Sequence, residues 1–421
     1  MLSLALPNVA TWSIAFVATL GVIARPYRVP EAIWAVLGAA ALVAAGLLAW
    51  PDALAAVGKG TDVYLFLTGM MLLAAMAREE GLFAHIAARA ANAADGSQPR
   101  LFALVYGIGT VVTILLSNDA TAVVLTPAVF AMVKAAKAEK ALPYLFICAF
   151  IANAASFVLP ISNPANLVVF REHMPLLLNW LTRFGAASLL SIVATYVVLR
   201  FTQRGSLKSK IERKIDVPEL SSAGSLVAWG IAGTGVALLV ASGVGIDLGF
   251  PTCLAAAITL AAVSVSKKAM LWSTIKSVSW GVLPLVAGLF VLVEGLEHTG
   301  ILRALADLLH IAAARSEIAT AWGAGVIVAL ATNLLNNLPA GLLTGAAVNM
   351  AQVPDKVAGA LLIGIDLGPN LSVTGSLATI LWLVALRREG LDVSAWRFLK
   401  LGALVMPPAL LLALGALALV G

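Results

Sequence analysis

Charged residues, cysteines and long hydrophilic stretches are all scarce in this chain of 421 residues. Asp, Glu, Lys and Arg make up 11% of the residues, whereas 61% are hydrophobic. Such a composition excludes one or two ordinary soluble domains, because it leaves too little polar surface to face water. The sequence therefore predicts an all-α polytopic membrane protein, with membrane lipid as its surroundings and no nucleic acid as a partner.

The chain contains two cysteines, Cys148 and Cys253, which lie far apart and within apolar runs. This spacing supports neither a disulfide framework nor a metal site made of thiolates, and nothing in the sequence indicates a cofactor. The first 20 residues lack a basic segment and a convincing cleavage site. We therefore expect no removable signal peptide.

Apolar runs predict ten membrane spans and two helical hairpins that enter the membrane without crossing it. The expected spans are 5–24, 31–50, 62–78, 142–171, 183–201, 224–242, 248–266, 280–297, 357–387 and 397–420, and the hairpins are 101–136 and 318–350. The hairpin arms are predicted to be too short to cross a bilayer, which takes about 20 helical residues.

Two parts of the chain share a pattern of glycines. Gly69 and Gly81 recur as Gly288 and Gly300, each 219 residues later. Five spans per part is an odd number, so we expect the second part to be inverted relative to the first, as in the inverted repeats of secondary transporters. The predicted first repeat, cytoplasmic linker and second repeat are residues 1–202, 203–222 and 223–421.

The distribution of basic residues predicts the orientation. With both termini outside, 21 of the 27 Lys and Arg residues lie on the cytoplasmic side. The opposite orientation would place most of them outside, against the positive-inside rule. We therefore expect a multi-pass protein of a bacterial-type inner membrane.

Polar residues interrupt the apolar sequence at four places. The tips of the two hairpins are Ser117–Thr121 and Asn336–Pro339, and two spans are broken by proline at Leu159–Asn166 and Asp366–Ser376. Proline opens a helix and frees backbone N–H and C=O groups. We expect the four breaks to converge on one cavity near the middle of the membrane.

Side chains at these breaks are the candidate ligands of a transported solute. A carboxylate in lipid costs at least about 2.5 kcal/mol, so Asp119 is expected to face protein or a water-filled cavity. The candidate substrate-binding residues are Asn118, Asp119, Thr121, Ser162, Asn163, Asn166, Asn336, Asn337, Asn370, Thr374, Gly375 and Ser376, and the candidate proton carriers are Asp119 and Asp366.

The predicted cavity contains hydroxyls, amides and two carboxylates but no Lys or Arg. It suits a small polyhydroxyl solute together with a proton or small cation better than a polyanion, because no fixed positive charge balances the acids.

Several motifs at the breaks resemble the ArsB-type arsenite efflux pumps of the ion transporter superfamily. They are Ser117–Thr121 through Pro127, Ile161–Asn163 with Asn166, Leu335–Pro339, and Asp366–Pro369 with Gly375–Trp382. The similarity extends over roughly residues 55 to 415. One departure is Asn370, where bacterial members carry Lys.

The resemblance implies a transporter and not an enzyme. It implies export of arsenite and antimonite from the cytoplasm in exchange for protons, and a soluble arsenite-stimulated ATPase as an optional cytoplasmic partner. Arsenite near neutral pH is mostly an uncharged trihydroxide, which hydroxyls, amides and a carboxylate can bind without cysteines.

Other interpretations stay open at this stage. Asp119 and Asp366 could satisfy backbone N–H groups, and Asn118, Asn336 and Asn337 could join the hairpin arms. A sodium–proton antiporter or a sodium-coupled carboxylate transporter of the same superfamily would have a similar pattern. An intramembrane aspartyl protease is remote, because Asp366 lacks the Gly-x-Gly-Asp arrangement of those enzymes.

Overall fold

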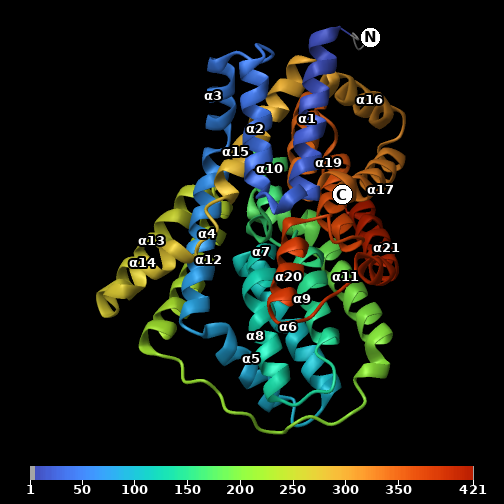
Figure 1. Cartoon of the computed structure of the whole chain (residues 1–421). Coiled ribbons are helices and arrows are strands. Elements are labelled where there is room, and N and C mark those ends of the chain that lie inside the picture. Colours follow the sequence, from blue (N-terminus) through green and yellow to red (C-terminus); the bar gives the residue numbers. More distant parts are fainter. Residues whose placement is uncertain (1–4, 421) are drawn as a thin grey trace.

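A computed structural model describes residues 5–420, so the extreme ends of the two predicted repeats, residues 1–4 and 421, lie outside the described residues. The regular elements in this range are helices (Figure 1). The first part of the chain contains α1 (Leu6–Ala24), η1 (Pro26–Arg28), α2 (Glu31–Ala44), α3 (Trp50–Lys59), α4 (Thr61–Glu79), α5 (Leu82–Ala93), α6 (Gln98–Leu116), α7 (Asn118–Ala120), η2 (Thr121–Leu125), α8 (Thr126–Ala135), α9 (Leu142–Ala154), η3 (Pro160–Ser162), α10 (Pro164–Val169), α11 (Leu177–Gln203) and η4 (Arg204–Ser206). The rest contains α12 (Ser222–Val244), α13 (Gly249–Ser266), α14 (Lys268–Ser277), α15 (Val282–His298), α16 (Ile301–Arg315), α17 (Glu317–Leu335), α18 (Asn337–Ala351), α19 (Asp355–Leu367), η5 (Gly368–Asn370), α20 (Leu377–Arg388) and α21 (Ala395–Leu419).

Seven of the described helices are long and apolar enough to cross a membrane, or eight if α14 and α15, which meet at 41°, form one bent span. They are α1, α4, α6, α12, α17, α21 and α11 together with η4. The predicted all-helical membrane protein is therefore confirmed. The count of ten spans includes shorter and broken helices and stays a prediction.

Two boundary predictions are wrong. The expected span 31–50 ends at Ala44, because Gly46 takes a left-handed φ of 67° and the separate helix α3 starts at Trp50, with Pro51 in its first turn. The first arm of each hairpin has 19 residues: α6 starts three residues before the predicted start at 101, and α17 one residue before the predicted start at 318. Ser97 and Ser316 cap these helices and start them earlier than the apolar runs suggest. Helix α14 was not predicted.

The elements that position the site occur twice in the same order. Helices α4, α5, α6, the turn at Ser117, α9 and α10 have counterparts in α15, α16, α17, the turn at Asn336, α19 and α20. The glycines Gly81 and Gly300, with φ of 70° and 78°, precede α5 and α16. The first helices of each part exchange partners, since α2 packs against α15 and α13 packs against α4.

Small residues bring these exchanged helices close together. Gly69 of α4 lies against the backbone of Thr252 in α13, and Gly288 of α15 lies against the backbone of Ala35 in α2. Close approach of this kind is how helices associate in a membrane, where lipid removes the hydrophobic driving force.

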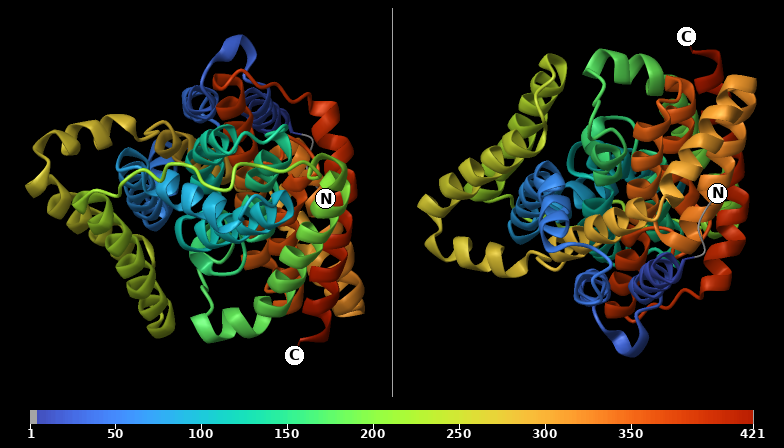
Figure 2. Two further views of the ribbon diagram at one scale, coloured as in Figure 1. Left: turned by 90° about the horizontal axis from the view of Figure 1, so that it is seen from below. Right: turned by 90° about the horizontal axis from the view of Figure 1, so that it is seen from above.

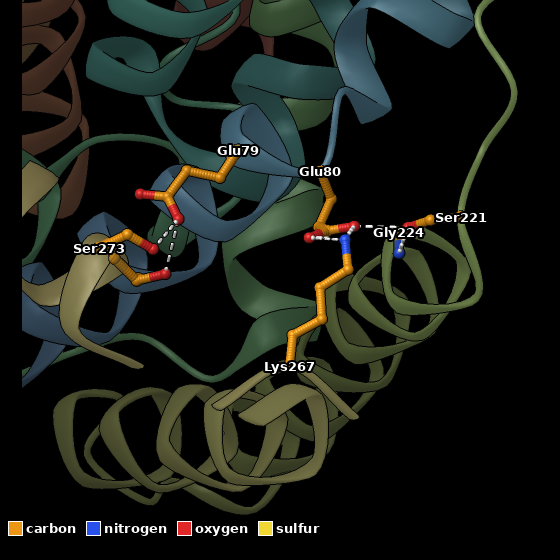
Figure 3. A network of polar contacts seen from close by, with 7 residues as sticks. Glu79, Glu80, Ser221, Gly224, Lys267 and Ser273 are labelled. Atoms are coloured by element: carbon orange, nitrogen blue, oxygen red, sulfur yellow. Dashed lines mark hydrogen bonds and ion pairs between the residues drawn. The ribbon is translucent and has the colours of Figure 1, made fainter. Parts of the chain in front are cut away.

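A polar network fixes the carboxyl-terminal end of α4 (Figure 3). The Glu80 carboxylate accepts hydrogen bonds from Lys267 Nζ, at 2.8 Å to each oxygen, and from Ser221 Oγ at 2.5 Å. Burial raises the pKa of Glu80, but the hydrogen bonds from Lys267 and Ser221 outweigh burial and leave the pKa below its ordinary value. The ionised carboxylate joins the ends of α4, α12 and α13.

The predicted linker is tied to the protein along much of its length. Residues 207–221 form an extended strap that runs around one end of the molecule from α11 towards α12 (Figure 1). Asn92 of α5 holds the strap backbone at both groups of Ile215, donating to its carbonyl at 3.1 Å and accepting from its N–H at 2.8 Å. Leu207 and Ile211 are buried.

Helices α12 to α14, yellow-green to gold, project at one edge of the molecule (Figure 2).

Adding one methyl group at Gly69 or Gly288 tests the two close helix contacts. A Cβ atom would lie 2.6 Å from the Thr252 carbonyl oxygen or 2.7 Å from the Ala35 carbonyl carbon, and backbone atoms cannot rotate away. We expect Gly69→Ala and Gly288→Ala each to lower the free energy of unfolding by about 1–3 kcal/mol. The measurement is thermal unfolding in detergent, in which each variant should have a lower Tm. Gly107→Ala is the control, because a Cβ there meets nothing within 4 Å. An equal loss of stability in Gly107→Ala would contradict the explanation.

Candidate functional site

Each hairpin turns at a non-glycine residue with a strained backbone. Ser117 has a φ of 107° and Asn336 a φ of 70°, and both end one helix and start the next. Such conformations cost of order 1–3 kcal/mol and persist only where the surroundings enforce them. After Ser117 the chain forms a single helical turn and then a π-helical stretch, η2, of a kind that is frequent at functional sites.

Hydrogen bonds within the first hairpin hold its tip. Thr113 and Thr121 Oγ1 atoms lie 2.8 Å apart across the turn, and the Asn118 side-chain oxygen accepts from the Asp119 N–H at 2.9 Å. Asn118 and Thr121 are buried, whereas Asp119 is half-buried. The carboxylate of Asp119 is therefore the polar group that the tip leaves accessible.

The first broken span is held by side-chain amides. Asn163 Nδ2 donates to Asp366 Oδ1 at 2.6 Å, which joins this break to the second one. Asn166 Nδ2 donates to the carbonyl of Ser156 at 2.8 Å. Ser162 Oγ donates to the Ile114 carbonyl at 3.2 Å and so links the break to α6.

The second broken span is held in a similar way. Asn370 Nδ2 donates to the Phe150 carbonyl at 3.1 Å, and Asn153 Nδ2 donates to Asn370 Oδ1 at 3.0 Å. Ser376 caps α20 by accepting from the Thr379 N–H at 3.1 Å. Asn370 and Asn153 are both buried.

The second hairpin packs directly on this break. Asn336 Nδ2 donates to the Thr374 carbonyl at 3.2 Å, and the Asn337 N–H donates to the Gly375 carbonyl at 2.8 Å. Asn333 adds a further link, because its backbone carbonyl accepts from Thr374 Oγ1 at 2.9 Å. The freed backbone groups of the break are thereby paired within the protein.

A cavity lies between the first hairpin and α4. Its empty volume is about 670 Å³, part of it open to solvent. Ser117 and Asp119 line it from the hairpin, Pro164 and Leu377 line it from the starts of α10 and α20, and Arg78 lies at the end of α4. The rest of the wall is largely apolar and comes from α4 and the start of α15; it includes Phe66, Leu67, Met70, Met71, Ala74 and Ala75.

The structure divides the predicted site residues into two groups. Asp119 lines the cavity, but Ser162, Asn336 and Thr374 are not among its lining residues. Asp366 is completely buried and paired with Asn163, so the prediction of a cavity with two carboxylates is wrong. The prediction of a cavity without Lys or Arg is also wrong, because Arg78 contributes to the wall. Both errors concern the direction in which a side chain points, of Asp366 in one case and Arg78 in the other. Tertiary packing decides that direction.

Three contributors were missed in the sequence. Asn153 and Asn333 join the breaks to neighbouring helices, and the exposed Arg78 donates to the Ser277 carbonyl at 3.3 Å. An Asn inside an apolar run was the available signal for the first two, because an amide in such a helix needs a partner. Arg78 carried no signal, since it lies among ordinary basic residues at a span end.

Apolar helices of membrane length around a cavity made by interrupted helices are the architecture of a multi-pass membrane transporter. The chain belongs to the CitMHS family, described as citrate transporter, which matches residues 14–368.

Relatives extend this result. The arsenical pump membrane proteins of Yersinia enterocolitica and Escherichia coli K12 are each 28% identical to this chain, over 83% of it and 84% of their own length. An uncharacterised transporter of Mycobacterium tuberculosis is 26% identical over 94% of this chain and 95% of its own. The predicted resemblance to arsenical pumps is thus confirmed.

One solved structure shows the same fold. The crystal structure of the Alcanivorax borkumensis YdaH transporter has a TM-score of 0.56 and 15% sequence identity, and it covers 87% of this chain and 86% of that one.

Cysteine labelling tests the different surroundings of the two acids. In a Cys148→Ser/Cys253→Ser background, we expect Asp119→Cys to react with a small water-soluble thiol reagent and Asp366→Cys to remain unmodified, because only Asp119 lines a cavity. Mass spectrometry of the purified protein measures the modified fraction. Equal modification at the two positions would show that this division of the site is incorrect.

Proposed function

We propose that this protein exports arsenite and antimonite from the cytoplasm in exchange for protons. The observation that carries the proposal is the Asp119 cavity, in which one half-buried carboxylate lies beside a hairpin tip in an otherwise largely apolar wall. A neutral trihydroxide can donate O–H groups to such a carboxylate without the cluster of cations that a polyanion needs. The 28% identity to arsenical pump membrane proteins supports this substrate class.

The proposed topology is two inverted repeats, residues 1–202 and 223–421, with ten spans, two hairpins and both termini outside an inner membrane. Two observations support it. The elements from α4 to α10 recur in order from α15 to α20, and the orientation places 21 of the 27 Lys and Arg residues in the cytoplasm. The residues of the predicted linker would then lie in the cytoplasm, where an ATPase partner is an optional addition.

In the proposed cycle, solute and proton use Asp119 in turn. The ionised carboxylate accepts hydrogen bonds from the solute on the cytoplasmic side. After the hairpin has moved to face outside, a proton binds the carboxylate and displaces the solute. With a neutral solute, each proton that enters gains about 2.3 kcal/mol per 100 mV of membrane potential. Asp366 accepts a hydrogen bond from Asn163, and we propose that this bond keeps the two broken spans together. Carrying the proton is the alternative role of Asp366.

Carboxylate transport is the second candidate function. Arg78 in the cavity wall and the family description as citrate transporter favour it. Arg78 supplies one positive charge, whereas citrate carries several negative charges that would need further cationic partners. We therefore rank carboxylate transport below arsenite export.

Replacing Asp119 by Asn tests the coupling. In everted membrane vesicles containing the wild-type protein, arsenite accumulation should rise as the vesicle interior is made more acidic. Asp119→Asn should remove this pH response, because an amide cannot exchange a proton in this range. The exposed carboxylate of Asp307 provides the control, and Asp307→Asn should behave as wild type. A wild-type pH response in Asp119→Asn would refute the coupling mechanism.

Replacing Arg78 by Gln separates the two substrate classes. Loss of a charged hydrogen bond costs about 1.5–3 kcal/mol, so citrate transport should fall roughly 10-fold to 100-fold if carboxylates are the substrates. Arsenite export should change by less than about twofold, since its substrate is uncharged. Uptake of radiolabelled citrate and of arsenite, measured in the same vesicle preparations, decides between them.

A further inference from the structure

A second, smaller crevice lies between α15 and the second hairpin. Its empty volume is about 380 Å³, against about 670 Å³ for the Asp119 cavity. Phe290, Val293 and Glu294 line it from α15, and Gly345 and Asn349 line it from α18. Lys59 at the end of α3 and Arg171 just after α10 complete the wall.

The two crevices occupy equivalent places in the two repeats. The shift of 219 residues that relates Gly69 to Gly288 also relates four residues of α4 that line the Asp119 cavity to four residues of α15 that line the second crevice. The four pairs are Met71 with Phe290, Ala74 with Val293, Ala75 with Glu294, and Arg78 with Glu297. The second crevice is therefore the counterpart, at the other hairpin, of the cavity that contains Asp119.

An ion pair in its wall distinguishes the second crevice from the first. Lys59 Nζ lies 2.5 Å from Glu294 Oε2, and these side chains are 39% and 14% exposed. The alanine equivalent to Glu294 in α4 can form no such pair. His298 Nε2 lies 3.8 Å from the other Glu294 oxygen, so Glu294 lies between two basic side chains.

Arg171, which follows α10, reaches the crevice beside Lys59 and Phe290. The Arg171 guanidinium lies 5.9 Å from the centre of the Phe290 ring and donates to the Lys59 carbonyl at 3.5 Å. Arg171 follows α10, which packs against α18 of the second hairpin. Arg171 thus bridges the crevice to the Lys59 carbonyl, and the ion pair with Glu294 holds Lys59 on the opposite wall.

We propose that Lys59, Glu294 and Arg171 form the gate that closes the exit side of the transport path. The inference rests on the proposed export function and extends it, because it assigns positioning residues that lie outside the Asp119 cavity. In the conformation described here the Asp119 cavity is the larger of the two and the charged crevice is the smaller. Separating Arg171 and α18 from Lys59 and α15 would open a path to the tip of the second hairpin.

The chemistry of the gate suits repeated opening. The Lys59–Glu294 pair lies on the α15 side of the crevice and stays paired when Arg171 and α18 withdraw, and a partly exposed pair of this kind contributes little net stability. Across the crevice Arg171 makes only long contacts, with the Lys59 carbonyl and the Phe290 ring, whereas its short ion pair is with the adjacent Glu172. Its withdrawal therefore leaves no deeply buried charge behind. The three side chains can therefore hold one conformation without preventing the other.

Cysteine accessibility in the purified full-length protein tests the gate without any substrate. In the Cys148→Ser/Cys253→Ser background, Asn349→Cys reports on the second crevice and Ala75→Cys on the Asp119 cavity. We expect Lys59→Gln, and separately Arg171→Gln, to raise the labelling rate at Asn349→Cys at least threefold and to lower the rate at Ala75→Cys. The exchanged pair Lys59→Glu/Glu294→Lys should bring both rates back towards those of the starting protein.

Arg183→Gln is the matched control, since it breaks an ion pair with Asp355 away from the crevice. It should leave both labelling rates unchanged, and size-exclusion profiles confirm that each variant is folded. Unchanged labelling at Asn349→Cys in Lys59→Gln, an equal rise in Arg183→Gln, or no recovery in the exchanged pair would each overturn the gate. Failure of arsenite export in vesicles would instead reject the proposed function and leave the labelling result standing.

Discussion

The structure depends on one constraint, which is that polar groups freed at a helix break inside a membrane must find partners within the protein. Four breaks would expose backbone N–H and C=O groups to lipid, where no water can satisfy them. Asn166, Asn336 and Asn370 supply such partners by donating to the backbone carbonyls of Ser156, Thr374 and Phe150. The breaks consequently have to lie close together, and the hairpins and broken spans become one interconnected unit. The cavity forms at its edge, where the hairpin meets α4.

This constraint also explains how much could be predicted. Proline, Asn and Ser inside apolar sequence locate the breaks, because few other roles account for them there. The repeated glycines indicate two related parts of the chain, and the structure places Gly69 and Gly288 in equivalent close contacts with the backbone of a neighbouring helix. The fold class and the hairpin tips were therefore accessible from sequence.

Other features were not accessible, since they depend on which way side chains point after packing. Asp119 and Asp366 look alike in sequence, yet one lines a cavity and the other is sealed against Asn163. Arg78 and Lys59 look like ordinary charges at span ends, yet each lines a crevice. The lengths of α2 and α6 depend on Gly46 and on the Ser97 cap, single residues whose effect is easily hidden within long apolar runs.

The exchange of helices between the two parts has a consequence for biogenesis. The α1–α2 pair packs against α15, which is synthesised more than 200 residues later, and α4 similarly waits for α13. During synthesis the small-residue faces of α2 and α4 enter the bilayer with only lipid beside them. Neither part of the chain can reach its final packing alone, so the newly inserted helices must stay separable until the last ones arrive. The final packing of this protein thus forms only after the helices of its second part have been inserted.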